Sequence, residues 1–165
     1  MVNPKEWGAD GWYFMHSLSQ NFKPEELEKY KKIFRALRWV LPCKVCREGY
    51  AQDLKKHRLN QIKDARSLSR WVLKMQNETN RKIGAKTISE YNLPNKYRHG
   101  RVINFLRIAM QDAVRSDNKK ALEELQRIRR LLVFVIPCSK CRYRMRNNDV
   151  PHFKKLFNVM QRSHQ

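Results

Sequence analysis

The stretch LRWVLPCKVCR, residues 37–47, joins an apolar helical pattern to a pair of cysteines. Proline cannot continue a helix, so we expect Pro42 to end one helix and a new helix to begin at the cysteines. Cys43 and Cys46 would then share a first turn, whose unpaired amides stabilise a thiolate on the first cysteine. The spacing leaves three interpretations open, namely a redox-active disulfide, a zinc site and a structural disulfide.

On both sides of this stretch, apolar residues recur at steps of three and four, whereas the alternation typical of strands is scarce. We therefore predict an all-α protein: a four- to five-helix bundle followed by a helical C-terminal extension. Asp10 is expected to cap the first helix. The following helices are expected over 23–41, from the cysteines to about residue 57, and over 67–83, where Gly84 suits the C-terminal stop.

A linker is expected at YNLPNKYRHG, residues 91–100, which holds a proline, a glycine and two asparagines. It divides the chain into a module of residues 1–92 and a basic helical domain of residues 93–165. In the second part we expect helices over 101–116 and 119–136 and a final amphipathic segment through Phe153, Leu156, Phe157 and Met160. Its stretch LLVFVIPCSKCR, residues 131–142, repeats the helix end and the Pro-Cys-x-x-Cys-Arg motif at a spacing of 95 residues. This repetition predicts a decayed internal duplication.

The chain has a formal net charge of +21, and its basic residues are spread along its whole length. Residues 1–90 carry 19 basic and 10 acidic side chains, and residues 91–165 carry 17 and 5. Such a charge favours contact with polyanions, whether nucleic acid, acidic protein surfaces or anionic lipid, and the alternative interpretation is a solvated basic surface. Because the sequence holds neither a membrane-spanning run nor a signal-peptide core, we expect a soluble intracellular protein with no membrane span.

Several polar and aromatic residues outside the cysteine pairs share helix faces. Trp12 and His16 are four residues apart, and Asn77, Asn80 and Gly84 follow at steps of three and four. Asparagine is unfavourable inside a helix, so this second group predicts a polar ligand lying against the backbone, with Trp71 as a flat wall. The alternative interpretation is a core of aromatic residues with asparagines that face water.

Taken together, three segments resemble the Erv/ALR family of FAD-linked sulfhydryl oxidases. WGADGWYFMHSLSQNF, residues 7–22, is similar to the opening Trp-Gly-x-x-x-Trp-x-x-x-His motif, and LPCKVC, residues 41–46, is similar to the active-site pair. SLSRWVLKMQNETNRKIG, residues 67–84, is similar to the helix that ends in His-Asn-x-x-Asn-x-x-Leu-Gly. The resemblance covers about 80 residues and implies a helical bundle that binds FAD, usually as a homodimer. Short viral members look similar, which suggests a large DNA virus as the source and the host-cell cytoplasm or the virion as the location.

The resemblance also implies a role for each matching residue. Cys43 would exchange with the dithiol of a protein substrate, while Cys46 would face the flavin. Electrons would pass from Cys46 to FAD and then to O2, giving H2O2, and no metal is expected. The implied cofactor-binding residues are Gly8, Trp12, His16, Phe22, Trp71, Gln76, Asn77, Asn80, Lys86 and Tyr91.

The sequence departs from the family pattern in ways that keep other hypotheses open. Gln76 replaces the family's histidine, although glutamine can also donate a hydrogen bond. In the second half, Cys138 and Cys141 lack the accompanying cofactor motifs, so this pair would be a shuttle for electrons or a structural disulfide. The alternatives to an enzyme are a basic nucleic-acid-binding protein with structural zinc and a catalytically degenerate relative that serves as an interaction module.

Overall fold

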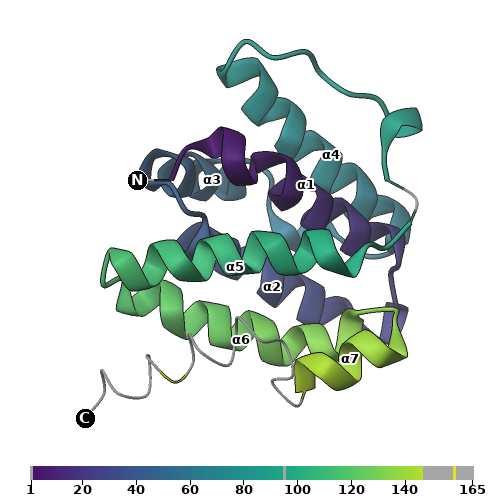
Figure 1. Cartoon of the computed structure of the whole chain (residues 1–165). Coiled ribbons are helices and arrows are strands. Elements are labelled where there is room, and N and C mark those ends of the chain that lie inside the picture. The colour runs from purple at the N-terminus through teal and green to yellow at the C-terminus, as the bar shows by residue number, and fades with distance from the viewer. Residues whose placement is uncertain (1, 95, 147–157, 159–165) are drawn as a thin grey trace.

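The computed structural model describes residues 2–94, 96–146 and 158, and the chain is helical without strands over this part (Figure 1). The all-α prediction is therefore confirmed. None of the helices in the described part is both long and apolar enough to cross a membrane. The α-helices are α1 (Pro4–Gln20), α2 (Leu27–Val40), α3 (Lys44–Lys56), α4 (Ala65–Lys82), α5 (His99–Arg115), α6 (Lys119–Val135) and α7 (Ser139–Arg146). Short 3-10 helices are η1 (Pro24–Glu26), η2 (Leu59–Gln61) and η3 (Glu90–Asn92).

The start of α1 differs from the prediction. Asn3 caps the helix, because its side chain accepts a hydrogen bond from the amide of Lys5 at 3.0 Å, and Pro4 fills the first helical position. The expectation that Asp10 is the cap was wrong, since these two residues supply an earlier start. The Asp10 carboxylate instead lies inside α1 and pairs with Arg101 of α5 at 2.7 Å.

The predicted breaks at Pro42 and Gly84 are confirmed. Helix α2 ends at Val40, and α3 begins two residues after the proline. Gly84 follows α4 with a φ of 70°, the left-handed conformation that favours glycine at a helix C-terminus. The amphipathic segment predicted through Phe153, Leu156, Phe157 and Met160 lies outside the described residues.

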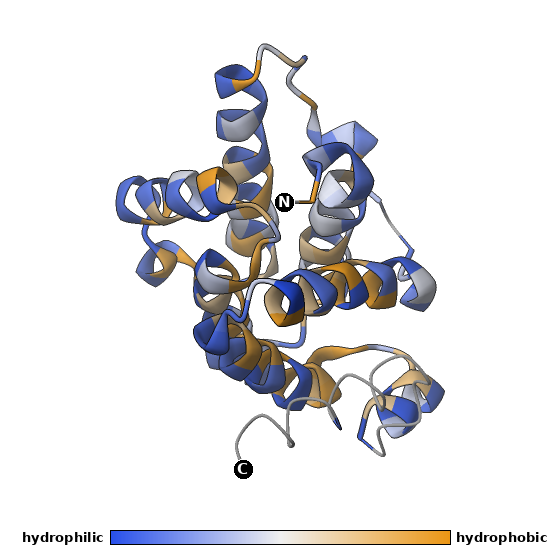
Figure 2. Cartoon of the chain, turned by 60° about the vertical axis from the view of Figure 1, so that its left-hand side comes forward, coloured by the Kyte–Doolittle hydropathy of each residue, from blue (hydrophilic) through white to orange (hydrophobic). Residues whose placement is uncertain are grey.

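The helices of the second half pack directly on those of the first. Helix α5 lies against α1, and α6 lies against α2 (Figure 1). Apolar residues line the facing sides of the helices, while charged residues cover the outside (Figure 2). Four large aromatic residues are completely buried in this core, and they come from α1, α2 and α5: Phe14, Tyr30, Phe34 and Phe105.

This core is continuous across the predicted boundary between residues 92 and 93. Buried residues from both sides of the boundary belong to one hydrophobic cluster. Phe105 of α5, for example, contacts Trp7 and Phe14 of α1, with ring centroids 6.1 and 5.2 Å apart. The division into two domains stays a prediction, but the two parts stabilise each other through shared apolar contacts.

Phe105→Ala is expected to lower the free energy of unfolding by about 3–5 kcal/mol, because it removes a fully buried ring and leaves a cavity. Urea denaturation followed by circular dichroism measures the change. Phe134→Ala is the matched control, since Phe134 is 49% exposed and should cost much less. Equal losses for the two variants would contradict the assignment of Phe105 to the core between the halves.

Candidate active site

The first cysteine pair lies at the break between α2 and α3. Cys43 is the N-cap of α3, and its Sγ accepts a hydrogen bond from the amide of Cys46 at 3.3 Å. Both thiols are free, with Cys43 buried and Cys46 half-buried. The side chain of Arg47 turns back and donates from Nη1 to the carbonyl of Leu41 at 2.7 Å. The pair is thus held on the first turn of a helix, as its spacing predicts.

The surroundings of Cys46 oppose ionisation of its thiol. Burial raises the pKa of Cys46 to about 12, and the hydrogen bond to Cys43 and the charge of that residue also raise it. The positive charge of Arg47 acts in the opposite direction. An Asp112 carboxylate oxygen on α5 lies 3.9 Å from Arg47 Nη1 and offsets part of that charge. At neutral pH Cys46 is therefore a protonated thiol.

A cleft of about 480 Å³ lies between α1, α4, the segment that follows α4 and the start of α5. It brings together three predicted site residues, Trp12, His16 and Gln76. The flat indole and the cationic side of the cleft suit a flat ligand that carries negative charge. The complete lining consists of Ala9, Trp12, Tyr13, His16, Gln76, Ile88, Asn92, Pro94, Lys96, Arg98 and Arg101.

His16, which lines this cleft, has a buried ring nitrogen that lacks a hydrogen-bond partner among the described residues. Its Nε2 is 2.7 Å from Oε1 of Gln76, and its Nδ1 has no hydrogen-bond partner within the described part of the chain. Burial lowers the pKa of His16, although the bond to Gln76 acts in the opposite direction. Because a carbonyl oxygen can only accept, Nε2 carries the hydrogen in the neutral ring, which leaves Nδ1 as an acceptor. A buried acceptor of this kind fits a ligand that donates a hydrogen bond.

Asn77 and Asn80 hold the segment that forms the far wall of the cleft. The Asn77 side chain donates to the carbonyl of Ile88 and accepts from its amide, both at 2.9 Å. Asn80 donates to the carbonyl of Lys86 at 3.0 Å. The sequence predicts that these asparagines contact a ligand directly, whereas in the structure they position the backbone beside the cleft. Their direct contact with a ligand stays a prediction.

Two aromatic residues of the predicted site lie elsewhere. Trp71 is buried, packs against Phe34 with tilted rings whose centroids are 5.4 Å apart, and donates from Nε1 to the carbonyl of His57 at 2.9 Å. Phe22 packs against Tyr30 at 5.2 Å between centroids. Neither side chain lines the cleft beside His16, and the contacts of both are those of core residues.

The remaining predicted residues lie at the surface of this region. Tyr91 is 99% exposed and does not line the cleft. The side chain of Lys86 is exposed as well, while its carbonyl anchors Asn80. A Cβ atom placed on Gly8 would meet no described atom within 4 Å, so no described part of the protein packs closely against this glycine. Roles for these three residues in cofactor binding stay predictions.

Eight residues that line the cleft were not predicted as site residues, and four of them are Tyr13 and the cations Lys96, Arg98 and Arg101. Tyr13 donates from its hydroxyl to the carbonyl of Lys96, and the guanidinium of Arg101 lies 4.2 Å from the centre of its ring. Arg98 and Lys96 are exposed at the edge of the cleft. Lys96 and Arg98 lie in the predicted linker and Arg101 follows it directly, and the sequence there gives no indication of which element these cations face.

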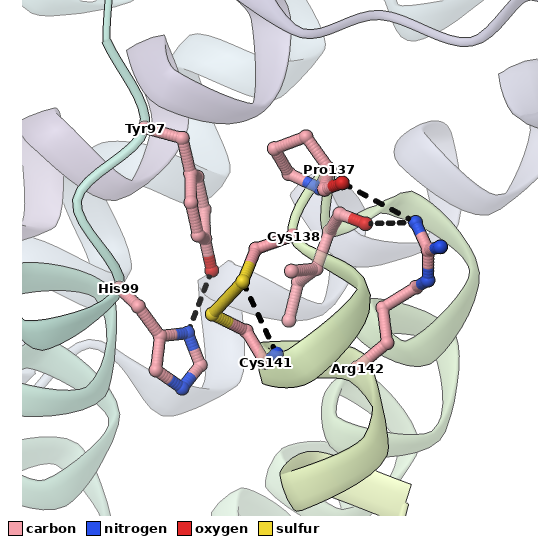
Figure 3. Close-up of a disulfide and its surroundings, with 7 residues drawn as sticks. Tyr97, His99, Pro137, Cys138, Cys141 and Arg142 are labelled. Atoms are coloured by element: carbon pink, nitrogen blue, oxygen red, sulfur yellow. Dashed lines mark hydrogen bonds between the residues drawn. A yellow bond between two sulfur atoms is a disulfide. The ribbon is translucent and has the colours of Figure 1, made fainter.

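The second cysteine pair lies at the start of α7, where Cys138 and Cys141 form a disulfide. Figure 3 shows Tyr97 and His99 beside this disulfide, with Tyr97 Oη and His99 Nδ1 3.0 Å apart. Burial and the charge of Arg144 lower the pKa of His99, so its ring is neutral at physiological pH. Cys138 is half-buried and thus more open to solvent than Cys43.

Across residues 2–94 and 96–146, no three His, Cys, Asp or Glu side chains are grouped as they would be around a metal ion. The zinc hypothesis requires such a group, usually formed by two cysteine pairs. In the structure the two pairs lie at different helix starts, and one of them is closed as a disulfide.

Comparison with known proteins agrees with the motifs. A sequence model described as the Erv1 / Alr family matches residues 9–98. The chain is also 32% identical over 94 residues to a probable FAD-linked sulfhydryl oxidase of Acanthamoeba polyphaga mimivirus. This match covers 53% of the chain and 66% of the relative, slightly less than two thirds of the relative's length. No solved structure matches the chain.

Asn77→Ala should release the far wall of the cleft, because the variant loses both hydrogen bonds to Ile88. Hydrogen exchange measured by NMR should show the Ile88 amide exchanging roughly tenfold faster or more. Asn80→Ala provides the control, since Asn80 bonds a carbonyl and leaves the Ile88 amide paired. Unchanged exchange at Ile88 in the first variant would show that Asn77 does not hold this segment.

Asp112→Asn should make the Cys46 thiol easier to ionise, because Arg47 then acts on it without a neighbouring carboxylate. In the reduced protein at pH 8, we expect alkylation of Cys46 to be about two- to fivefold faster, measured by mass spectrometry of its peptide. Asp10→Asn is the control, because this acid also links α1 and α5 but pairs with Arg101. An alkylation rate that rises equally in both variants would point to loosened packing instead of charge.

Proposed function

Because the chain belongs to the Erv1 / Alr family, we propose that it is an FAD-linked sulfhydryl oxidase that forms disulfides in protein substrates. The observation that carries this proposal is a cysteine pair held at the start of α3, in a bundle whose α1 and α4 line a cleft with an unsatisfied histidine nitrogen. The name of the mimivirus relative supports the same activity.

The residues of the cleft fit FAD in three ways. Trp12 offers a flat apolar surface to a ring system, and His16 Nδ1 offers an acceptor to a ring or ribose hydrogen. Lys96, Arg98 and Arg101 supply positive charge for the pyrophosphate. When bound, FAD would take up the electron pair of the reduced cysteines and transfer it to O2, giving H2O2.

The protein's own residues would carry out the thiol chemistry. A substrate thiolate attacks the Cys43–Cys46 disulfide, and a second substrate thiol then resolves the mixed disulfide. The substrate gains one disulfide, while Cys43 and Cys46 become thiols, so two electrons and two protons enter the protein. We assign Cys43 as the sulfur that the substrate thiolate attacks, as the family resemblance implies. Because Cys43 is buried, the incoming thiolate must first displace the groups that cover its sulfur.

We further propose that the Cys138–Cys141 disulfide shuttles electrons from protein substrates to the first pair. Its greater exposure makes it reachable by a folded substrate, and the neutral ring of His99 beside it can take up a thiol proton. The structural alternative is a disulfide that only stabilises the start of α7. Contact with polyanions and a location in the host-cell cytoplasm or the virion stay predictions.

The purified protein should be yellow and release FAD on denaturation. Cys46→Ser should abolish oxygen consumption with dithiothreitol yet retain FAD, because Cys43 alone cannot form the disulfide that the substrate thiolate attacks. The double variant Cys138→Ser/Cys141→Ser is the matched control, because it should still oxidise dithiothreitol but lose activity toward a reduced protein substrate. Undiminished turnover of Cys46→Ser would refute the proposed role of the first pair.

The same measurements separate the rival functions. Bound flavin without thiol-dependent H2O2 would indicate an interaction module that has lost its activity. A colourless protein with stoichiometric zinc and salt-sensitive DNA binding would indicate the nucleic-acid-binding alternative.

A further inference from the structure

The two halves of the chain share more sequence than their cysteine motifs. LEKYKKIFRALRWVLPCKVCR, residues 27–47, and LEELQRIRRLLVFVIPCSKCR, residues 122–142, align without gaps at a spacing of 95 residues. They are identical at ten of 21 positions. The identities include buried positions of the helices, such as Ile33 and Ile128, as well as the prolines and cysteines.

The helix boundaries keep the same spacing. Helix α1 (Pro4–Gln20) and helix α5 (His99–Arg115) both begin and end 95 residues apart. The ends of α2 and α6, at Val40 and Val135, and the starts of α3 and α7 are also separated by 95 residues. Three successive helices therefore recur in the same order and with closely similar limits.

The turns that carry the cysteines repeat the same hydrogen bonds, although the first pair is free and the second is a disulfide. The Cys46 amide points to Sγ of Cys43 at 3.3 Å, and the Cys141 amide points to Sγ of Cys138 at 3.2 Å. In the same way, Arg47 donates to the carbonyl of Leu41 at 2.7 Å, and Arg142 donates to that of Ile136 at 2.9 Å. Both cysteine pairs are thus presented by the same local structure.

Of the three repeated helices, α1 and α2 of the first unit (residues 1–92) pack against their own counterparts in the second unit (residues 96–146). Helix α1 contacts α5, and α2 contacts α6, which is the pattern of a two-fold interface between identical subunits. Trp39 and Phe134, counterparts in the repeat, are each covered by a cation of the opposite unit. Lys120 lies 5.7 Å from the ring of Trp39, and Lys29 lies 4.6 Å from that of Phe134.

This internal interface leaves no room for a second chain between the units. The fully buried side chains of Phe105, Ile128 and Leu132 fill it from the second half. At Gly11 the helices come so close that an added Cβ would lie 3.3 Å from the ring of Phe105. The side of α1 and α2 that contacts α5 and α6 is therefore already covered.

We propose that the second half is a diverged copy of the first that takes, within one chain, the place of a partner subunit. The protein is then a monomer, in contrast to the homodimer that the family resemblance implies. The copy has lost the cleft residues, because Arg107 and Gln111 stand where Trp12 and His16 stand in the first unit. Of the two counterpart helices α1 and α5, α1 alone carries the tryptophan and histidine that line the cleft.

Multi-angle light scattering of the full chain tests the proposal directly. The expected mass is that of one chain, 20.0 kDa, at all micromolar concentrations. A mass of two chains would overturn the proposal. Because the measurement involves neither flavin nor oxygen, its outcome is independent of the proposed oxidase activity.

A charge swap between Asp10 and Arg101 tests whether the contact forms within one chain. Asp10→Arg and Arg101→Asp should each lower the Tm by about 3–6 °C, and the double variant should recover most of this loss. A mixture of the two single variants, unfolded and refolded together, should not recover, because each chain supplies both sides of its own interface. Recovery in the mixture would show exchange between chains and overturn the proposal.

The control is a swap between Arg70 and Glu90, which form an exposed pair within the first unit at 3.4 Å. Its single variants should change the Tm by less than about 1 °C, since such surface pairs contribute little. The single variants of Arg70 and Glu90 could instead lower the Tm as much as those of Asp10 and Arg101. The losses would then reflect charge reversal in general, and the assignment of Asp10–Arg101 to an internal interface would fail.

Discussion

Burial of the apolar sides of α1 and α2 by α5 and α6 is the constraint on which the rest of this structure depends. The aromatic core between them fixes α1, and α1 in turn supplies one wall of the cleft. The contact of α6 with α2 fixes the end of α2, where Pro42 turns the chain and makes Cys43 the cap of α3. Both the cleft and the first cysteine pair are therefore positioned by packing contributed from the second half.

Polar contacts between distant segments complete the site. Asn77 attaches the segment after α4 to the helix itself, and this segment carries Lys96 and Arg98, two of the three cations that line the cleft with Trp12 and His16. Arg47, next to the first cysteine pair, is paired with Asp112 from α5. Positive charge in the cleft and the ionisation of Cys46 thus depend on residues that the linear motifs do not include.

Local patterns predicted the elements well, because proline, glycine and helical periodicity act over a few residues. The breaks at Pro42 and Gly84 follow from backbone chemistry alone. The start of α1 was misjudged because Asn3 is as good a cap as Asp10 and precedes it. Contacts between the halves, such as those of Tyr13 and Arg101 in the cleft, depend on how α5 folds back on α1. Nothing in the short-range pattern specifies that arrangement.

Fusion of two equivalent helix sets in one polypeptide also changes how the interface can evolve. In a two-fold homodimer, every substitution appears on both sides of the symmetry axis, so a change that harms one copy harms both. Here α2 and α6 are encoded separately, and Trp39 can face Lys120 while its counterpart Phe134 faces Lys29. One unit can then keep Trp12 and His16 while the other has Arg107 and Gln111 at the equivalent positions.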